Sequence, residues 1–156
     1  MVQMKSLINL KLTKEGLEKL KAEFAELTEK RPQVLERMVA AREMGDLSEN
    51  AGYHASREEL SRIDNRLAEL KVLMRFGQVV EPKSSDQVQI GSSVELTNGK
   101  DFFEYKIVGE LEGDPANGKI SEVSPMGSAL IGKKAGDEVE IETPNGTISY
   151  KIVKIK

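Results

Sequence analysis

The sequence of 156 residues predicts an α+β protein built from an N-terminal α-helical hairpin and a C-terminal, mostly antiparallel β domain. In the first half, apolar residues recur at the heptad spacing of a coiled coil, whereas in the second half short β-branched runs alternate with turn signals. The pattern and the composition both change near residue 78. We therefore expect two domains, comprising residues 1–78 and 79–156.

The composition excludes several classes of protein. No stretch approaches the roughly 20 apolar residues of a membrane span, and the N-terminus lacks the apolar core of a signal peptide, so we expect a soluble chain with no membrane partner. The absence of Cys and the single His54 exclude disulfides and thiolate metal sites and argue against a Ser-His-Asp triad. The expected compartment is the cytoplasm. With 23 Lys and Arg against 26 Asp and Glu, the chain lacks the net positive charge of a general nucleic-acid binder.

The first helix is predicted from residue 13 to about residue 44. Thr13 is the expected N-cap, and Glu15 in the first turn suits the helix dipole. Pro32 removes one backbone hydrogen bond and should bend the helix near residues 28–32, but the apolar register resumes beyond it, so we expect a continuous helix. The apolar stripe has Arg31 at one of its heptad positions and otherwise consists of Leu17, Leu20, Phe24, Leu27, Val34, Met38 and Ala41.

A second stripe follows a turn at Gly45-Asp46 and ends before Gly77. It has Ser56 at one heptad position and otherwise consists of Tyr53, Leu60, Ile63, Leu67, Leu70 and Met74. Two such helices can bury their stripes by folding back on each other, which predicts an antiparallel coiled-coil hairpin. At about 1.5 Å per residue the hairpin would be on the order of 45 Å long, more than so small a domain needs for its core. This length suggests reach, although a dimerising coiled coil is an alternative reading.

The second half predicts strands at residues 93–97, 102–108, 119–123, 138–142 and 147–155. Asn98-Gly99 and Asn145-Gly146 are strong hairpin signals. A one- or two-turn helix is expected within residues 124–132. This half carries 9 basic and 13 acidic residues, against 14 and 13 in residues 1–78, so the β domain is acidic. Its aromatic residues would form the sheet core or its edge, or alternatively a docking surface; they are Phe102, Phe103, Tyr105 and Tyr150.

Two acids, Asp46 and Glu49, lie at the predicted turn of the hairpin. In one interpretation Asp46 begins the second helix and Glu49 lies in its first turn, where both cap free N–H groups. In the other, the two carboxylates are hard oxygen ligands, too few to hold Mg²⁺ alone but sufficient to share one with a partner's acids or a phosphate. A shared ion of this kind can activate water for attack on a phosphodiester.

The segment AREMGDLSENAGYHA (residues 41–55) resembles the tip of the bacterial Gre transcript-cleavage factors, and SPMGSALIGK (residues 124–133) resembles the signature of their C-terminal domain. The order and separation of the two motifs also agree, so the resemblance covers nearly the whole chain. It implies an FKBP-like C-terminal domain that docks at the rim of the RNA polymerase secondary channel and a coiled coil that enters the channel. The acids matching Asp46 and Glu49 then help to hold the polymerase's second Mg²⁺ and a water, and backtracked nascent RNA is cut near its 3′ end so that elongation resumes.

By this resemblance the chain is a monomeric member of the DNA-binding transcription proteins that lends groups to the polymerase and is not itself an enzyme. Asp46 and Glu49 are the expected catalytic and Mg²⁺-binding residues. The residues expected to support the tip and the RNA are Arg42, Ser48, Asn50, Tyr53 and Arg57, and those expected to dock on the polymerase are Ser124, Pro125, Leu130, Ile131 and Gly132. Many relatives carry an acid where this chain has Gly52, so a third carboxylate is absent here. In its modest positive charge, the arm resembles the arms of the family branch that produces short RNA fragments.

Some of these residues have ordinary structural interpretations. Arg42, Arg57 and Arg62 could contact RNA phosphates or instead pair with Glu43, Glu58 or Glu59 on the helix surface. Tyr53 could stack on a base, but closing the seam between the helices is the simpler role, and His54 is expected on the helix surface.

Two other functions are consistent with parts of the pattern. A Gre-like regulator would occupy the channel without supporting cleavage, but the intact Asp46 and Glu49 argue against it. An FKBP-like prolyl isomerase or chaperone would need an aromatic-rich pocket, and the second half has four aromatic residues and no Trp.

Overall fold

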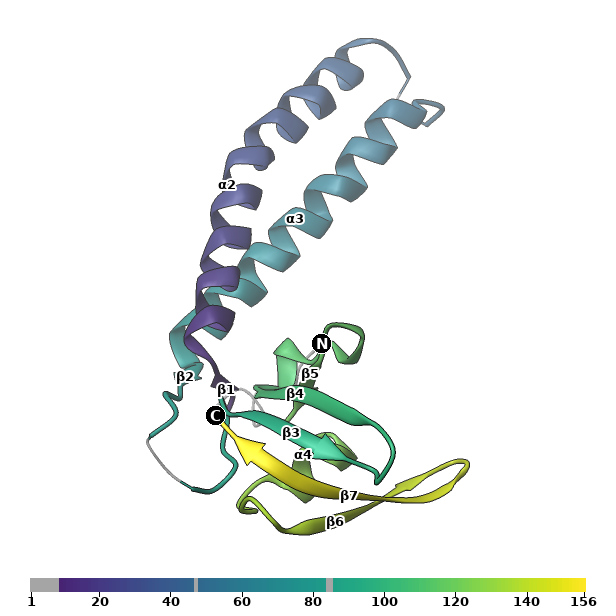
Figure 1. Cartoon of the computed structure of the whole chain (residues 1–156). Helices are drawn as coiled ribbons and strands as arrows, with labels where there is room; N and C mark the ends of the chain where they lie inside the picture. Colours follow the sequence, from purple (N-terminus) through teal and green to yellow (C-terminus); the bar gives the residue numbers. More distant parts are fainter. Residues whose placement is uncertain (1–8, 47, 84–85) are drawn as a thin grey trace. The chain divides into compact units, whose positions relative to one another are not determined.

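The computed structural model describes residues 9–46, 48–83 and 86–156 (Figure 1). The chain divides into two compact units. One is Glu18–Phe76, a helical hairpin, and the other is Gly77–Lys156 together with the described residues up to Leu17, which contains the β-sheet. The predicted α+β class is confirmed, with paired helices first and the sheet after them. Within the described residues, no helix is sufficiently long and apolar to traverse a lipid bilayer.

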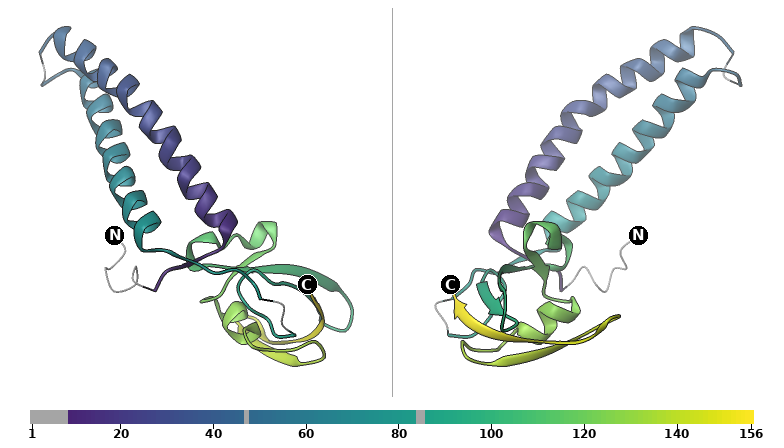
Figure 2. Two further views of the ribbon diagram at one scale, coloured as in Figure 1. Left: turned by 90° about the vertical axis from the view of Figure 1, so that its left-hand side faces the viewer. Right: turned by 45° about the vertical axis from the view of Figure 1, so that its right-hand side comes forward.

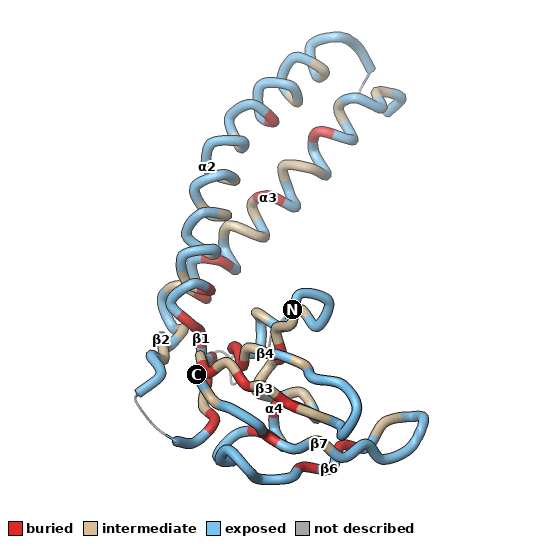
Figure 3. The backbone as a smooth tube through the Cα atoms, viewed as in Figure 1, coloured by how far each residue is buried: buried red, intermediate tan, exposed pale blue. Residues whose placement is uncertain are grey.

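The hairpin consists of α2 (Lys14–Glu43) and α3 (Ala51–Phe76), which lie side by side and run in opposite directions (Figures 1 and 2). As predicted, α2 continues without interruption through Pro32. All the predicted heptad positions are buried or half-buried, including the polar ones, Arg31 and Ser56. Figure 3 shows that buried positions in the hairpin are few and spaced among exposed ones. The predicted seam is therefore the contact between the two helices, and it is narrow.

Ion pairs across the seam supplement this narrow contact. Arg31, at a heptad position of α2, donates two hydrogen bonds to the Asp64 carboxylate of α3, at 2.5 Å and 3.1 Å. This paired geometry suits a planar guanidinium and fixes one helix against the other. Two further sets of pairs join the helices, Arg66 to Glu23 at 2.6 Å and 2.9 Å, and Glu59 to both Lys30 at 3.0 Å and Arg37 at 3.1 Å.

The second unit contains a five-stranded sheet in the order β5-β4-β3-β7-β6. Three of its neighbouring pairs are antiparallel and β5 runs parallel to β4, so the sheet is mostly antiparallel, as predicted, with one parallel pair at this edge. The chain between them forms two 3₁₀ turns, η1 (Glu110–Glu112) and η2 (Pro115–Asn117), which return it to the end of the sheet where β4 began. The strands are β3 (Ser93–Thr97), β4 (Phe102–Val108), β5 (Lys119–Ser121), β6 (Glu138–Thr143) and β7 (Gly146–Ile155).

The two Asn-Gly signals mark hairpins, as predicted, but not with Asn-Gly at the centre of a two-residue turn. Thr143 pairs with Gly146, so the residues of the β6–β7 turn are Pro144 and Asn145. At the β3–β4 turn the Asn98 side chain accepts hydrogen bonds from the N–H groups of Lys100 and Asp101 and closes a four-residue loop. The side chain of Asn98 shapes this turn, and the positive φ, 95°, belongs to Gly99.

One face of the sheet is covered by the short helix α4 (Pro125–Leu130), within the segment where a helix was predicted. Ser124 caps it by accepting the Gly127 N–H at 3.0 Å. A side chain at Gly127 would overlap the Ser121 carbonyl oxygen, so the close packing of α4 on β5 requires glycine there. The core between sheet and helix consists of Val88, Val94, Leu96, Ile107, Ile120, Leu130, Val139, Ile141 and Ile152.

The four aromatic residues of this unit do not form one cluster. The Phe103 ring stacks on Tyr105 at 6.2 Å and meets Tyr150 edge-on at 6.0 Å, beside the core. Phe102 is 67% exposed, because successive residues of β4 point to opposite faces of the sheet. Phe102 was therefore wrongly grouped with the other three.

The start of α2 is fixed inside the same unit. Thr13 is the N-cap, as predicted, and its hydroxyl accepts the Gly16 N–H at 3.0 Å. The Glu112 carboxylate of η1 accepts hydrogen bonds from the Thr13 N–H at 2.9 Å, from the Thr13 hydroxyl and from the Gly109 N–H at 3.1 Å. Just before the cap, β1 (Lys11–Leu12) pairs in parallel with β2 (Gln78–Val79). The first turn of α2 is thus held by residues almost a hundred positions away.

Candidate functional site

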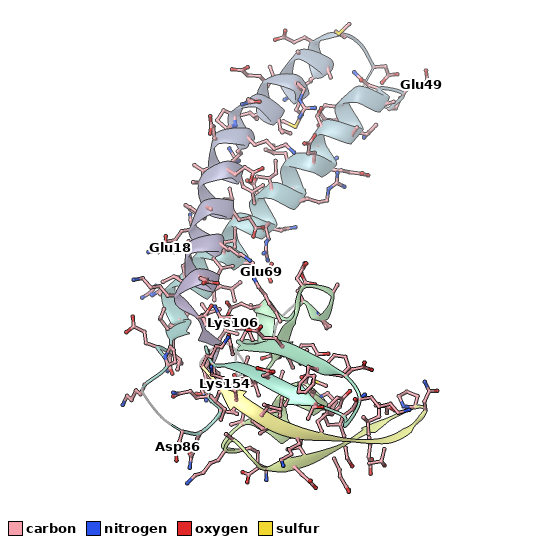
Figure 4. The ribbon with its side chains drawn as sticks, viewed as in Figure 1. Glu18, Glu49, Glu69, Asp86, Lys106 and Lys154 are labelled. Carbon is pink, nitrogen blue, oxygen red and sulfur yellow. The ribbon has the colours of Figure 1, made fainter. Side chains whose placement is uncertain are left out.

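The loop of residues 44–50 joins the two helices and is called the tip below. Figure 4 labels Glu49 at the far end of the hairpin, and Asp46 belongs to the same loop. Both side chains are exposed. Because α3 begins only at Ala51, both acids precede the helix, and the prediction that they start it and occupy its first turn is wrong.

Asn50 caps α3 in place of the two acids. Its side-chain oxygen accepts the Tyr53 N–H at 3.0 Å, and its side-chain amide donates to the Ala41 carbonyl in the last turn of α2. An amide can do both because it carries an acceptor and a donor, whereas a carboxylate can only accept. Asn50 therefore closes the tip from both sides, and the acids are left out of the helix.

A hydrogen bond within the loop favours the ionised form of Asp46. One of its carboxylate oxygens accepts the Ser48 N–H at 3.0 Å. This backbone hydrogen bond, with a contribution from the Ser48 side chain, lowers the pKa of Asp46 below its ordinary value. The carboxylate is charged at neutral pH, and its exposure leaves it available as an oxygen ligand.

The tip forms a shallow, open concavity of about 430 Å³. Asp46 and Glu49 both contribute to it, beside Ala41, Met44, Gly45, Asn50, Ala51 and Gly52. Carboxylate oxygens suit a hard cation such as Mg²⁺, which commonly takes one or two carboxylates and completes its shell with water or phosphate. In the described part of the chain no three His, Asp or Glu side chains gather in a way that could hold a metal ion. The tip therefore offers part of a ligand set.

The basic residues near the tip differ in their pairing. Arg42 and Arg57 are exposed, and neither forms an ion pair with any residue that the structure describes. Arg62 pairs with Glu58 at 3.9 Å along the helix, as its structural interpretation predicted. Glu59 instead bonds across the seam to α2. Arg42 and Arg57 are therefore available to a phosphate, and Arg62 is partly engaged.

The two rings beside the tip match their structural interpretations. Tyr53 is half-buried at its heptad position, and His54 is exposed on α3 with its ring edge-on to Tyr53 at 5.5 Å. Gly52 lies in the first turn of α3, where it carries no carboxylate. Ser48 is exposed and supports Asp46 through its N–H.

The motif at residues 124–132 contains both residues that stabilise the fold and residues exposed on the surface. Leu130 is completely buried in the core of the β-sheet unit, so it cannot be a direct contact for a partner. Ser124 caps α4, and Gly132 has a φ of 81°, which glycine adopts without strain. Pro125 is exposed and Ile131 is 38% exposed. Of the five predicted docking residues, these two present the most accessible apolar surface.

An apolar concavity of about 490 Å³ lies next to this motif and was not expected from the sequence. Its residues come from several loops and strands, so no local pattern indicates it. Tyr105 is its one aromatic residue, and the others are Gly113, Pro115, Ile120, Ser121, Ser124, Pro125, Met126, Ile141, Glu142, Thr143 and Pro144. The sequence also predicted no role for Met44. The one sequence feature that could have indicated its exposure is its position outside the heptad register.

Comparison with known families now accounts for both units. Residues 10–79 match the family described as "Transcription elongation factor, N-terminal", and residues 82–156 match "Transcription elongation factor, GreA/GreB, C-term". The chain belongs to the GreA/GreB family of transcription elongation factors. The predicted resemblance is thereby confirmed.

Curated relatives agree with the GreA branch. The chain is 42% identical over 148 residues to transcription elongation factor GreA of a Nitratiruptor species, which covers 92% of this chain and 91% of the relative. It is 43% identical over 150 residues to GreA of Thermoanaerobacter pseudethanolicus, covering 93% and 96%. It is also 42% identical over 149 residues to GreA of Lactococcus lactis subsp. cremoris, covering 92% and 96%.

Among solved structures, GreA factor homolog 1 of Thermus thermophilus is 28% identical, with a TM-score of 0.44 over 95% of this chain and 99% of that one. The GreA/GreB factor from Nitrosomonas europaea is 30% identical, with a TM-score of 0.43 over 64% of this chain and 86% of that one.

Proposed function

We propose that this GreA-like factor binds RNA polymerase and stimulates the polymerase's own cleavage of backtracked nascent RNA, so that arrested complexes resume elongation. The observation that carries the proposal is the pair of exposed carboxylates, Asp46 and Glu49, in a loop at the end of two long helices. A short turn would join the helices equally well. An exposed pair of acids at such a point is suited to completing a site on another molecule.

Each tip residue has a role in this proposal. The Ser48 N–H donates to the Asp46 carboxylate, and Asn50 fixes the loop against both helices, so that Asp46 and Glu49 are presented in a restricted geometry. The oxygens of both acids would contribute ligands to a Mg²⁺ ion shared with the polymerase. When bound, such an ion lowers the pKa of a coordinated water and stabilises negative charge in phosphodiester attack. The chain itself supplies no complete catalytic site and is proposed to act only with its partner.

Other surfaces would assist this action. Arg42 and Arg57 have no ion-pair partner among the described residues and are proposed to contact phosphates of the nascent RNA, with Tyr53 behind them closing the seam. Pro125 and Ile131 would dock on the polymerase, while Ser124, Leu130 and Gly132 hold that surface in shape. The chain would act as a monomer in the cytoplasm, where it meets the polymerase.

The test is a transcript-cleavage assay with stalled, backtracked polymerase and the full chain. We expect Asp46→Asn and Glu49→Gln each to lower the rate of RNA shortening by roughly 10–100-fold, the range seen when a group supporting a metal site is lost. Glu43→Gln is the matched control, because Glu43 is also an exposed acid but lies in α2 outside the tip. It should cleave as the wild type does.

Equal cleavage by the wild type and both tip variants would refute the proposal. If the wild type slows initiation without shortening RNA, the chain is instead a regulator that occupies the same site. Binding of each variant to the polymerase, measured separately, shows whether a lost rate reflects chemistry or attachment.

A further inference from the structure

Met44 is an apolar side chain whose position packing does not explain. It is 86% exposed, more than any other large hydrophobic residue among those the structure describes. Its backbone is ordered by the end of α2, since the Met44 N–H donates to the Ala41 carbonyl at 3.1 Å. The fold therefore holds this residue in place by its main chain and leaves its thioether in solvent.

The other methionines of the described chain are shielded. Met38 and Met74 occupy heptad positions and are half-buried in the seam, and Met126 packs against the core of the β-sheet unit. Met1 and Met4 lie outside the described residues. The oxidation rate of a thioether follows its accessibility to the oxidant. Of the four described methionines, Met44 should therefore react first.

The reaction is a two-electron oxygen transfer. A lone pair on the Met44 sulfur attacks one oxygen of hydrogen peroxide, the O–O bond breaks, and that oxygen stays on sulfur as the sulfoxide. The second oxygen leaves with both hydrogens as water, so the sulfur is oxidised by two electrons and the peroxide is reduced by two. Thiol-dependent methionine sulfoxide reductases reverse the change.

The location of Met44 gives this reaction a consequence. Its side chain lines the same concavity as Asp46 and Glu49. Oxidation replaces an apolar group with a polar, chiral one whose oxygen is a strong acceptor. Because Met44 is so exposed, the fold should tolerate the change, and the effect should fall on whatever the tip contacts. Burial of the apolar Met44 side chain against a partner would favour the complex, and oxidation would remove this favourable contribution to binding.

We propose that Met44 is a reversible oxidation site at which peroxide-type oxidants disable the tip. This inference rests on the proposed function for its effect on activity, but not for the location of the oxidised residue. It assigns to the tip a redox sensitivity in addition to its two acids.

The first experiment locates the oxidation. The full chain is treated with graded hydrogen peroxide, quenched with catalase and mapped by peptide mass spectrometry. We expect Met44 to be half-oxidised at a peroxide dose at least about threefold lower than Met38, Met74 or Met126 require. Equal or slower oxidation of Met44 would overturn the proposal, whatever the protein does to RNA.

The second experiment measures the effect, using quenched protein and untreated polymerase. The cleavage rate of each oxidised protein is divided by that of its own unoxidised form. At the dose that oxidises Met44 alone, the wild type should lose at least about threefold in this ratio and recover with sulfoxide reductase, whereas Met44→Leu should lose nothing. Circular dichroism should show the same helix content before and after treatment.

The outcomes separate the two claims. If the wild type and Met44→Leu lose activity equally, or if neither loses any, the inference is wrong while the proposed function stands. If untreated protein shortens no RNA, the proposed function fails, the predicted effect of oxidation fails with it, and peptide mapping alone decides whether Met44 is the oxidation site.

Discussion

The helical hairpin and the β-sheet unit bury their residues in different ways. In the hairpin the fully buried positions are few and spaced along one seam, and ion pairs such as Arg31–Asp64 span the gap between them. In the β-sheet unit nine buried apolar residues form one continuous core between sheet and α4. A two-helix arm has only one line of contact to bury, whereas a sheet covered by a helix buries a whole face.

This difference in burial determines where functional residues can be substituted without a loss of folding stability. At the tip, Asp46, Glu49 and Met44 are exposed, so substituting their side chains removes no buried packing. In the motif at residues 124–132, accessible and buried residues alternate within one short helix and turn. The exposed residues of the tip can therefore all contact a partner. In the motif at residues 124–132 only some of the residues can.

The sharpest test of this contrast is the adjacent pair Leu130 and Ile131. Leu130 is fully buried, so Leu130→Ala should lower the free energy of unfolding by about 2–5 kcal/mol through lost burial and the cavity left behind. Urea denaturation followed by circular dichroism measures this change. A loss under about 1 kcal/mol would mean that the core is not organised around α4.

Ile131→Ala is the control for this substitution, since its side chain is 38% exposed and lies just outside α4. Ile131→Ala should lower the free energy of unfolding by less than about 1.5 kcal/mol. If docking uses the surface proposed above, Ile131→Ala should nevertheless weaken polymerase binding in a direct binding assay.

A smaller effect is expected at the junction where α2 leaves the β-sheet unit. Thr13→Ala removes the N-cap of α2 and one of the hydrogen bonds to Glu112, and should cost about 1–2 kcal/mol. Thr28→Ala is the matched control, because the Thr28 hydroxyl donates to the Phe24 carbonyl on an exposed helix face. It should change the free energy of unfolding by less than about 0.5 kcal/mol. Equal effects would show that the Thr13 hydroxyl, with its bonds to Gly16 and Glu112, stabilises the fold no more than an exposed Thr hydroxyl does.

The sequence was most informative where structure is local and periodic. The heptad positions of both helices, the Thr13 cap and the short helix after Ser124 all follow from spacing and residue type within a few positions. The heptad positions were predicted because a 3.5-residue repeat shows directly which residues share a face, but Leu73, which is also buried in α3, was not among them.

What was missed depends on contacts between residues distant in the chain. The Asn50 cap was overlooked because its advantage over Asp46 and Glu49 lies in reaching the Ala41 carbonyl across the loop. Glu112 bonds to Thr13 over 99 positions, and the parallel pairing of β5 depends on the path of two 3₁₀ turns. Leu130 looked like a surface motif residue because a motif does not show which of its members face inward.

The smallest predicted effect concerns the hairpin's own ion pair and its dependence on pH. The Arg31 guanidinium donates hydrogen bonds to Asp64 and holds the pKa of that carboxyl below its ordinary value of 3.8. A carboxyl with a lowered folded-state pKa stabilises the fold above its unfolded pKa, and this contribution disappears as the pH falls through the folded-state pKa. Both side chains are partly exposed, so solvent screening keeps the contribution of this pair small.

A double-mutant cycle with Arg31→Met and Asp64→Asn measures this coupling in urea at a pH near 7 and again near 2. The coupling should be present at the higher pH and absent at the lower one. Arg62 and Glu58, 3.9 Å apart along α3 and more exposed, give the control cycle, in which coupling should stay below about 0.5 kcal/mol. Equal coupling in both cycles would mean that Arg31 stabilises the seam by packing its aliphatic stem and not by its ion pair with Asp64. Coupling that persists in acid would mean that the interaction of the two side chains does not depend on the Asp64 charge.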